Sequence, residues 1–423
     1  MNSFVIKTLG CKVNQCDSQG LKDLLFSLGW LEAEKIEDAD LCVINTCCVT
    51  QSADRKSRNF IREILRKKNS RTRAAVTGCY VRYDKSALEK IDRIDLIFQI
   101  NEKETFQQWI RSSFPRPSAH KNIVGCASFS HRTRAFLKIQ DGCNNRCSYC
   151  VVPLVRGLSR SKPMNAIKDE AKSFLDSGHK EIVLTGVNLG SFGKDFDKRL
   201  DLVDCIDSLE NLDGLLRLRL SSIEAGDITS RLLSKMASSK KLCPHLHIPF
   251  QSGDDAVLKA MNRKLSVLDY QRIVERSYGK IKDLAITCDV IVGFPGEEEK
   301  HFQHTLNFLK YVKPLRTHIF TFSERKGVSV YGSKNSCPVA CVRKRYKIVK
   351  ELSDSLALDF KARFLGKNLD VIFEDNDGGI WSGYSPNYIR VGLKSPGFLK
   401  NVIKNVQLKR IEGDRVLSCE NTK

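Results

Sequence analysis

The chain has 423 residues, 16 of them cysteines, and a formal net charge of +21 at neutral pH. This length predicts two or three domains, each large enough to bury a core of its own. No apolar run reaches transmembrane length and no signal peptide is visible at the N-terminus, so we expect a cytoplasmic protein with reduced thiols, which excludes membrane insertion and a disulfide framework.

Residues 1–115 alternate strand and helix patterns, which predicts an open parallel α/β sheet with helices on both faces. The strands are expected at residues 4–6, 41–44 and 74–76, and the helices at residues 17–28 and 52–68. Each strand ends at a cysteine: Cys11, Cys47 or Cys79, here called the second trio. Because the carboxyl ends of parallel strands share one edge of a sheet, these thiols should converge and could hold an iron–sulfur cluster. The alternative is a chance coincidence in a cysteine-rich chain.

The helix expected at residues 52–68 is strongly basic. Its cations that could contact phosphates are Arg55, Lys56, Arg58 and Arg62. Together with the net charge, they favour nucleic acid as the partner, and the alternative is a solvated helix face. A linker at residues 112–131 then separates this domain from the next.

Six apolar runs alternate with helices between residues 132 and 335, which predicts a partial (βα)6 barrel. The runs are residues 135–139, 181–187, 215–220, 245–249, 285–292 and 318–322, and the helices are residues 164–175, 202–209, 228–236, 267–278 and 299–312. Barrel sites lie at the carboxyl ends of the strands. There we expect a pocket for a small polar ligand, formed by Thr185, Gly186, Asn188, Ser222, Gln251, Gly293, Pro295, Gly296 and Glu297.

Cys143, Cys147 and Cys150, here called the first trio, follow the first of these runs with three and then two residues between them. Thiolates this close repel one another, so we expect a metal or a cluster to order them. A zinc site would need a fourth ligand, and the nearest are Cys126 and His131. Three thiols without an obvious fourth fit a 4Fe-4S cluster with one open iron. The alternative is a buried thiol group or a disulfide with a spare cysteine, which the polar loop disfavours.

Residues 338–366 are expected to form a helix that packs on the barrel, with an apolar stripe from Val339 through Tyr346 to Leu356. Residues 367–423 predict a small β-barrel, with strands at residues 369–373, 388–391 and 406–411. Tyr388 and Arg390 could stack on or pair with RNA. The alternatives are that Tyr388 only packs on a strand face and that Arg390 is only a solvated charge.

The first trio, with Tyr149 before its last cysteine, resembles the motif of the radical S-adenosylmethionine (SAM) superfamily. The stretch from Gln140 to Gly157 is similar to one branch of it, the methylthiotransferases. The N-terminal motifs Gly-Cys-Lys-Val-Asn-Gln, Asn-Thr-Cys-Cys-Val-Thr and Thr-Gly-Cys resemble that family's second-cluster domain. Within the family, the motif Gly-Cys-Lys-Val-Asn-Gln at residues 10–15 resembles that of the group acting on N6-threonylcarbamoyladenosine in tRNA.

The resemblance implies two 4Fe-4S clusters, one on each trio, and two SAM molecules per turnover. Tyr149 and the strand-end residues above would bind SAM. The 5′-deoxyadenosyl radical formed from SAM would abstract hydrogen from C2 of the adenine at tRNA position 37. It also implies a TRAM-like RNA-binding C-terminal domain, the tRNA anticodon loop as partner, and an electron-donor protein such as a flavodoxin or ferredoxin. The sulfur source is left open. The alternative substrates are isopentenyladenosine and a ribosomal-protein aspartate, and a non-catalytic, metal-stabilised RNA-binding protein is the remote alternative.

Two positions depart from the family pattern. The family has an acidic residue after the Arg-Gly pair at positions 156 and 157, whereas this chain has Leu158 and Ser159. Cys16 and Asp17 replace an aromatic or aliphatic residue and a glutamate. Both departures lie outside the two trios.

Overall fold

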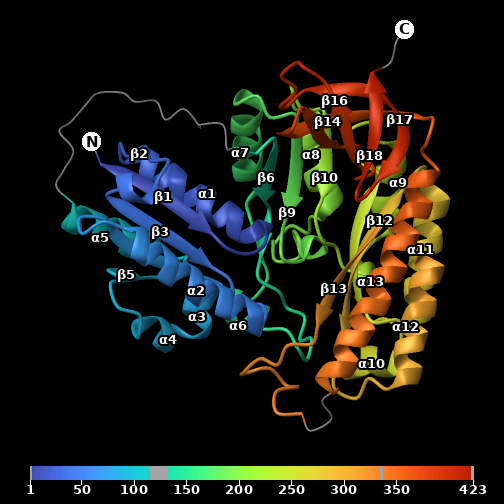
Figure 1. Cartoon of the computed structure of the whole chain (residues 1–423), viewed down its shortest axis with the longest axis horizontal. Helices are drawn as coiled ribbons and strands as arrows, with labels where there is room; N and C mark the ends of the chain where they lie inside the picture. The colour runs from blue at the N-terminus through green and yellow to red at the C-terminus, as the bar shows by residue number, and fades with distance from the viewer. Residues whose placement is uncertain (1, 115–131, 334–336, 421–423) are drawn as a thin grey trace.

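The computed structural model describes residues 2–114, 132–333 and 337–420. Figure 1 shows an N-terminal α/β domain beside a central set of strands wrapped by helices, with a C-terminal β-barrel packed against the central part. Within the described ranges, no helix combines the length and the apolar character that crossing a bilayer requires.

The N-terminal domain is a five-stranded parallel sheet in the order β2-β1-β3-β4-β5. Its strands are β1 (Ser3–Thr8), β2 (Leu31–Glu32), β3 (Leu41–Thr46), β4 (Arg73–Gly78) and β5 (Leu96–Ile97). Its helices are α1 (Lys12–Ser27), α2 (Gln51–Lys67), α3 (Cys79–Tyr83), α4 (Lys85–Glu89) and α5 (Lys103–Ser113). Leu21 of α1 and Phe106 of α5 belong to one core cluster, and Ile61 of α2 and Tyr80 of α3 to another. The predicted sheet with helices on both faces is confirmed.

The central domain is a partial barrel of six parallel strands, built from the sheets β6-β9-β10 and β11-β12-β13. Single bridges from Leu218 to Leu242 and from Ser222 to His247 join the two sheets. The strands are β6 (Arg134–Lys138), β9 (Glu181–Thr185), β10 (Arg217–Leu220), β11 (His245–Gln251), β12 (Ala285–Val292) and β13 (Arg316–Thr321). The helices are α6 (Val152–Arg156), α7 (Met164–Asp176), α8 (Leu202–Glu210), α9 (Ser230–Ser238), α10 (Asp255–Ala260), α11 (Val267–Lys280) and α12 (Glu299–Val312). The predicted six-stranded barrel is confirmed.

A long helix, α13 (Val339–Ala362), runs along α12 and β13 and leads to the C-terminal barrel. Val349 of this helix belongs to the central core, whereas Phe360 belongs to the core of the C-terminal barrel, so α13 joins the two. The barrel is closed in the order β14-β15-β16-β18-β17. Its strands are β14 (Asn368–Asp377), β15 (Ile380–Tyr384), β16 (Arg390–Lys394), β17 (Ile403–Glu412) and β18 (Arg415–Glu420).

Several predicted boundaries were wrong. The first helix begins at Lys12 rather than at residue 17, because its first turns bury the polar Asn14 and Asp17 and so lack an apolar period. The strand expected at 388–391 begins at Arg390, since Tyr388 has a φ of +67°. The strands β15 and β18 were not predicted, and Val339 and Tyr346 of the expected stripe are exposed.

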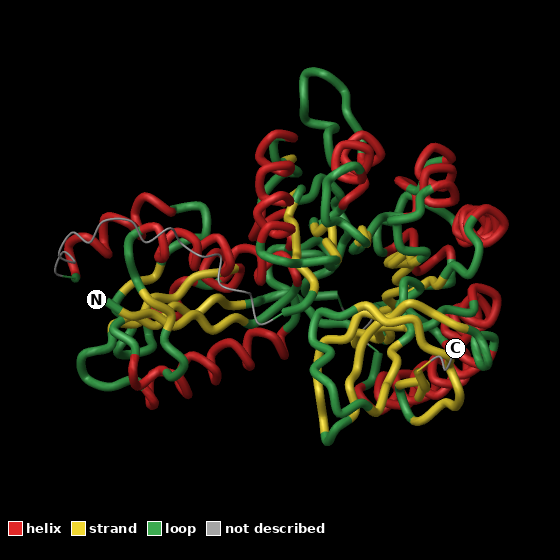
Figure 2. Tube along the Cα trace, turned by 90° about the horizontal axis from the view of Figure 1, so that it is seen from above, coloured by secondary structure: helices red, strands yellow, loops and turns green. Residues whose placement is uncertain are grey.

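The N-terminal domain packs against the barrel with α1 against β6 and α3 against α6. Figure 2 shows the N-terminal sheet to one side of the barrel and the C-terminal barrel on another. The ends of β1, β3 and β4 that carry the second trio therefore lie on the side of the sheet that faces the barrel.

Candidate functional site

The first trio lies in the loop between β7 (Gln140–Asp141) and α6, beyond the carboxyl end of β6. Gly142 makes the turn possible: its φ is +72°, and a Cβ atom there would lie 2.0 Å from the carbonyl oxygen of Leu158. On the far side, the hydroxyl of Ser148 donates to the carbonyl of Ala260 at 2.8 Å. The loop is therefore fixed at both ends, and its three thiols line one cavity.

This cavity, of about 310 Å³, lies at the carboxyl ends of the barrel strands. Four of the predicted cofactor-binding residues line it: Tyr149, Asn188, Ser222 and Gln251. Gln251 has a φ of +70°, and such backbone strain in a residue other than glycine is typical of binding and catalytic sites. Val49 and Thr50, from the N-terminal domain, line the same cavity. Both domains therefore build its wall.

The other predicted cofactor-binding residues lie elsewhere. Thr185, Gly186, Gly293, Pro295, Gly296 and Glu297 do not line this cavity. Glu297 is buried and accepts from the backbone N–H of Gly293 and from Arg345, each at 2.7 Å, so it ties the turn after β12 to α13. Phe294 of that turn packs edge-on against Tyr149, with ring centroids 6.5 Å apart. The turn therefore contacts the cavity residue Tyr149 through the ring of Phe294.

Three charged residues that we did not predict line the cavity: Glu224, Arg263 and Asp289. Arg263 donates to Glu224 at 2.9 Å and lies 3.7 Å from the Sγ of Cys147. Asp289 lies within a strand of otherwise mostly apolar residues and pairs with His247 at 3.2 Å. Asp289 could have been predicted from the sequence, because an acidic residue inside a buried strand is unusual. No sequence feature pointed to Arg263, since it lies in a turn far from the cysteines in sequence.

The second trio follows three adjacent strands, β1, β3 and β4. The thiols of the second trio influence one another electrostatically: burial raises the pKa of the Cys47 thiol to about 11, and Cys79 and Cys11 add to the shift. That all three bind one cluster stays a prediction. A fourth thiol joins them, since Cys48 donates to Cys79, which lowers the pKa of Cys79 and raises that of Cys48. Cys11 is exposed, whereas Cys47, Cys48 and Cys79 are buried.

The donor chemistry of both trios fits iron–sulfur clusters, which are bound by soft thiolates. Burial raises the pKa of the Cys150 thiol to about 12, so its deprotonated form is favoured only when a metal stabilises it. Within residues 2–114, 132–333 and 337–420, no three Cys, His, Asp or Glu side chains converge closely enough to hold a single metal ion. The thiols of the first trio instead line a cavity wall.

The residues predicted to contact RNA divide into two groups. Arg55, Lys56 and Arg62 are exposed on α2, whereas Arg58 donates to the hydroxyl of Tyr80 at 2.5 Å. In the C-terminal barrel, Arg390 pairs with Asp414 at 2.5 Å.

Tyr388 packs against the central domain. Its ring stacks on that of His245 at 4.5 Å, and the guanidinium of Arg219 lies over it at 4.8 Å. The ring of Tyr388 is thus engaged in an interdomain contact. A base could stack on it only by displacing His245 or Arg219.

Comparison with known proteins places these features in a family. Residues 3–99 match the model described as "Uncharacterized protein family UPF0004", and residues 137–309 match the Radical SAM superfamily. The chain is 35% identical over 420 residues to "Threonylcarbamoyladenosine tRNA methylthiotransferase MtaB" of Chlamydia pneumoniae, covering 98% of this chain and 97% of the relative. It is 34% identical to the protein of the same name from Thermotoga maritima, covering 99% and 97%.

The chain is also similar to relatives named for a different nucleoside and to solved structures. The chain is 33% identical to "tRNA-2-methylthio-N(6)-dimethylallyladenosine synthase" of Clostridium tetani, covering 83% of this chain and 80% of the relative. The structure of the radical SAM methyltransferase TsrM from Kitasatospora setae, with cobalamin and a [4Fe-4S] cluster bound, matches with a TM-score of 0.55 at 13% identity, covering 90% of this chain and 81% of that one. This last likeness shows a shared fold.

A thiol trio beyond the first strand of a six-stranded parallel barrel, within a matched Radical SAM region, defines the class of the protein as a radical SAM enzyme. Its similarity to methylthiotransferases extends over nearly the whole chain. The chain belongs to the radical SAM methylthiotransferase family, a family of transferases whose cofactors are SAM and 4Fe-4S clusters.

Proposed function

We propose that this enzyme attaches a methylthio group to C2 of N6-threonylcarbamoyladenosine at position 37 of tRNA, next to the anticodon. The first trio would hold one 4Fe-4S cluster and the second trio the other. The supporting observation is that the first trio lines the cavity together with one loop of the second trio, since Val49 and Thr50, which follow Cys47 and Cys48, also line it.

The choice of nucleoside rests on the relatives. Those named for threonylcarbamoyladenosine are 34–35% identical to this chain over 93–99% of its length. Those named for dimethylallyladenosine are 29–33% identical over 83–97%. The difference in identity is small, so the substrate has to be tested directly.

SAM bound to a reduced cluster supplies the radical chemistry that breaks an aromatic C–H bond, which side-chain acid–base chemistry cannot do. The chain's own residues then have to bind, orient and exclude water. Asn188, Ser222 and Gln251 offer hydrogen bonds to the polar groups of SAM from three strand ends. Tyr149, packed on Phe294, gives the cavity an apolar wall.

Binding of the tRNA would use surfaces outside the cavity. The exposed cations Arg55, Lys56 and Arg62 project from α2, whose N-terminal residue Gln51 donates its backbone N–H to the cavity residue Ser323 at 2.8 Å. Helix α2 would thus bind tRNA phosphates, and the neighbouring cavity would receive a base turned out of the anticodon loop. The C-terminal barrel would add contacts through Arg390.

The reaction also needs partners that lie outside this chain. Reduction of the clusters would be carried out by an electron-donor protein such as a flavodoxin or ferredoxin. The enzyme would act in the cytoplasm, which a tRNA substrate and free thiols support. The sulfur atom would be supplied through the second trio from a donor of its own.

Nucleoside mass spectrometry of tRNA from cells lacking the gene tests the proposal. We expect the 2-methylthio form of threonylcarbamoyladenosine to disappear and its unmethylthiolated precursor to accumulate. Loss of 2-methylthio-isopentenyladenosine instead, or of the modified aspartate of a ribosomal protein, would assign the enzyme to the corresponding alternative substrate.

Metal analysis separates the enzyme from a non-catalytic RNA-binding protein. Anaerobic purification and reconstitution should yield about eight irons per chain, four for each cluster. A chain that retained zinc and bound no iron would contradict both cluster assignments.

A further inference from the structure

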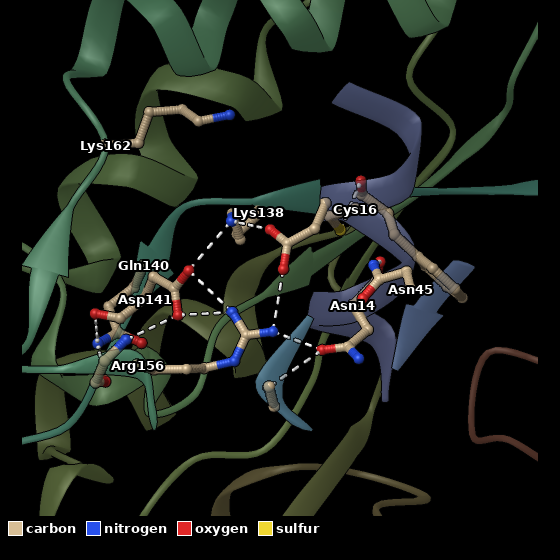
Figure 3. Close-up of polar contacts among 12 residues, drawn as sticks. Asn14, Cys16, Asn45, Lys138, Gln140, Asp141, Arg156 and Lys162 are labelled. Carbon is tan, nitrogen blue, oxygen red and sulfur yellow. Dashed lines mark hydrogen bonds and ion pairs between the residues drawn. The ribbon is translucent and has the colours of Figure 1, made fainter. Parts of the chain in front are cut away.

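Arg156 ends α6, the short helix that begins just after Cys150, and it is buried between the two domains. Its guanidinium donates to both oxygens of Asp141 at 3.0 Å and to Asp17 of α1 at 2.9 Å. Lys138 also pairs with Asp17 and Asp141 (Figure 3). The two cations and two carboxylates balance, and they join the loop of the first trio to the N-terminal domain.

Asn14 connects the ionic group of Arg156, Lys138, Asp17 and Asp141 to the second trio. Its side-chain oxygen accepts from Arg156 and lies 3.5 Å from the Sγ of Cys79 (Figure 3). Its side-chain nitrogen donates to the carbonyls of Leu9, at 3.0 Å, and Thr46, at 2.9 Å. One amide thus touches all three cysteine loops of the second trio, since Leu9 precedes Cys11 by two residues and Thr46 precedes Cys47 by one.

We propose that Arg156 is a positioning residue that fixes the second trio relative to the cavity of the first trio, acting through Asn14, and that its charge stabilises the reduced state of a cluster held there. This inference rests on the proposed assignment of a cluster to the second trio. The planar fork of arginine suits the task, because a single side chain reaches Asp141, Asp17 and Asn14 in fixed directions. A lysine would keep the charge but lose this geometry.

The charge has a direct electrostatic consequence. The guanidinium of Arg156 donates to the side-chain oxygen of Asn14, which lies 3.5 Å from the Sγ of Cys79, so a positive charge stands close to that sulfur. Reduction of a cluster adds negative charge, which a nearby cation stabilises in a low-dielectric site. Removing the cation should therefore make the second cluster harder to reduce.

Arg325 provides a matched control. It is also buried, and it also joins the barrel to the N-terminal domain, through two hydrogen bonds to Asp54 of α2 at 2.6 and 3.0 Å. Its charge reaches Cys48 but is not in contact with the second trio. Arg325→Gln thus loosens the domain contact without removing the cation beside Cys79.

The test is an electron paramagnetic resonance redox titration of the reconstituted full-length enzyme and its variants Arg156→Gln, Arg156→Lys and Arg325→Gln. Added SAM shifts the signal of the cluster that binds it, so the unshifted signal belongs to the second cluster. We expect Arg156→Gln to lower the reduction potential of the second cluster, Arg156→Lys to restore it, and Arg325→Gln to change it less. We also expect Arg156→Lys to remain slow in methylthiolation, since it restores charge but not geometry.

Equal potentials in Arg156→Gln and Arg325→Gln would overturn the charge role, and normal methylthiolation by Arg156→Lys would overturn the positioning role. If Arg156→Gln fails to hold the second cluster, Arg156→Lys decides: a full complement of iron with slow turnover supports the inference, and normal turnover overturns it. A wild-type enzyme holding about four irons instead of about eight would count against the two-cluster assignment itself.

Discussion

Arg263 and Glu224 form an ion pair on the wall of the cavity, with the guanidinium 2.9 Å from the carboxylate and 3.7 Å from the Sγ of Cys147. The side chain of Arg263 is 5% exposed and that of Glu224 is 24% exposed, so the guanidinium is shielded from water. It thus gives the middle cysteine of the first trio a fixed, charged neighbour, although the two residues come from a turn and a loop far apart in the chain.

Replacing Arg263 with methionine should slow reductive cleavage of SAM by roughly tenfold to hundredfold, because groups that orient metal ligands typically contribute that much. Iron content should stay near that of the wild type, since no thiol is removed. The measurement is 5′-deoxyadenosine formation under a fixed reductant, with Arg272→Met as control, an exposed cation whose partner Asp269 lies 3.8 Å away. A variant that cleaves SAM at the normal rate would show that the ion pair does not influence this site.

The assignment of the second trio can be tested against its neighbour Cys48. Cys79→Ala should lower the iron content from about eight to about four per chain, because a three-thiolate site does not survive the loss of a ligand. Cys48→Ala should keep about eight, since Cys48 contributes a hydrogen bond to Cys79. The reverse pattern, with iron lost on removal of Cys48, would transfer the ligand role to that residue.

The basic face of α2 predicts a salt-dependent interaction with tRNA. Replacing Arg55, Lys56 and Arg62 with alanine should weaken binding and reduce the slope of log K against log salt by about 0.7–0.9 for each phosphate that the protein no longer neutralises. Binding would be followed by filter retention or fluorescence anisotropy at several salt concentrations. The matched control replaces the exposed Arg343, Lys344 and Lys347 of α13, which lies away from the N-terminal sheet (Figure 1). Equal slopes in the two triple variants would exclude α2 as a specific tRNA-binding surface.

Much of this architecture is predictable from the sequence because it follows hydrophobic periodicity. The parallel strands β3 and β12 are nearly continuous apolar runs, and cysteines stand where β1, β3 and β4 end. The convergence of the second trio therefore follows from topology alone.

The parts that sequence reasoning missed depend on polar groups that pair across domains. Asn14 and Asp17 interrupt the apolar pattern at the start of α1, and their burial is explained by partners distant in the sequence, Arg156 among them. Glu297 does not line the cavity, and one oxygen of its carboxylate accepts from Arg345. Such pairings join residues more than a hundred positions apart, or on different helices, and a local pattern carries no information about them.

Lys12 offers a test of substrate choice, because it follows Cys11 directly and its side chain is influenced by two other cations. Burial lowers the pKa of Lys12, and Arg134 and Arg219 lower it further, although Tyr388 and Cys11 raise it. In the described part of the chain it forms no ion pair with a carboxylate. An anionic ligand would offset this unfavourable setting, and the threonylcarbamoyl substituent carries a carboxylate whereas the dimethylallyl group is apolar.

We expect Lys12→Met to reduce kcat/KM for threonylcarbamoylated tRNA by roughly tenfold to hundredfold, since a hydrogen bond to a charged group contributes about 1.5–3 kcal/mol. Binding of the same tRNA with unmodified adenosine at position 37 should be unchanged, because it lacks the carboxylate. The control is Lys22→Met on the same helix, where the native lysine is paired with Glu32. An equal reduction with both tRNAs would mean that Lys12 interacts with the phosphate backbone or supports the fold, and does not bind the threonyl group.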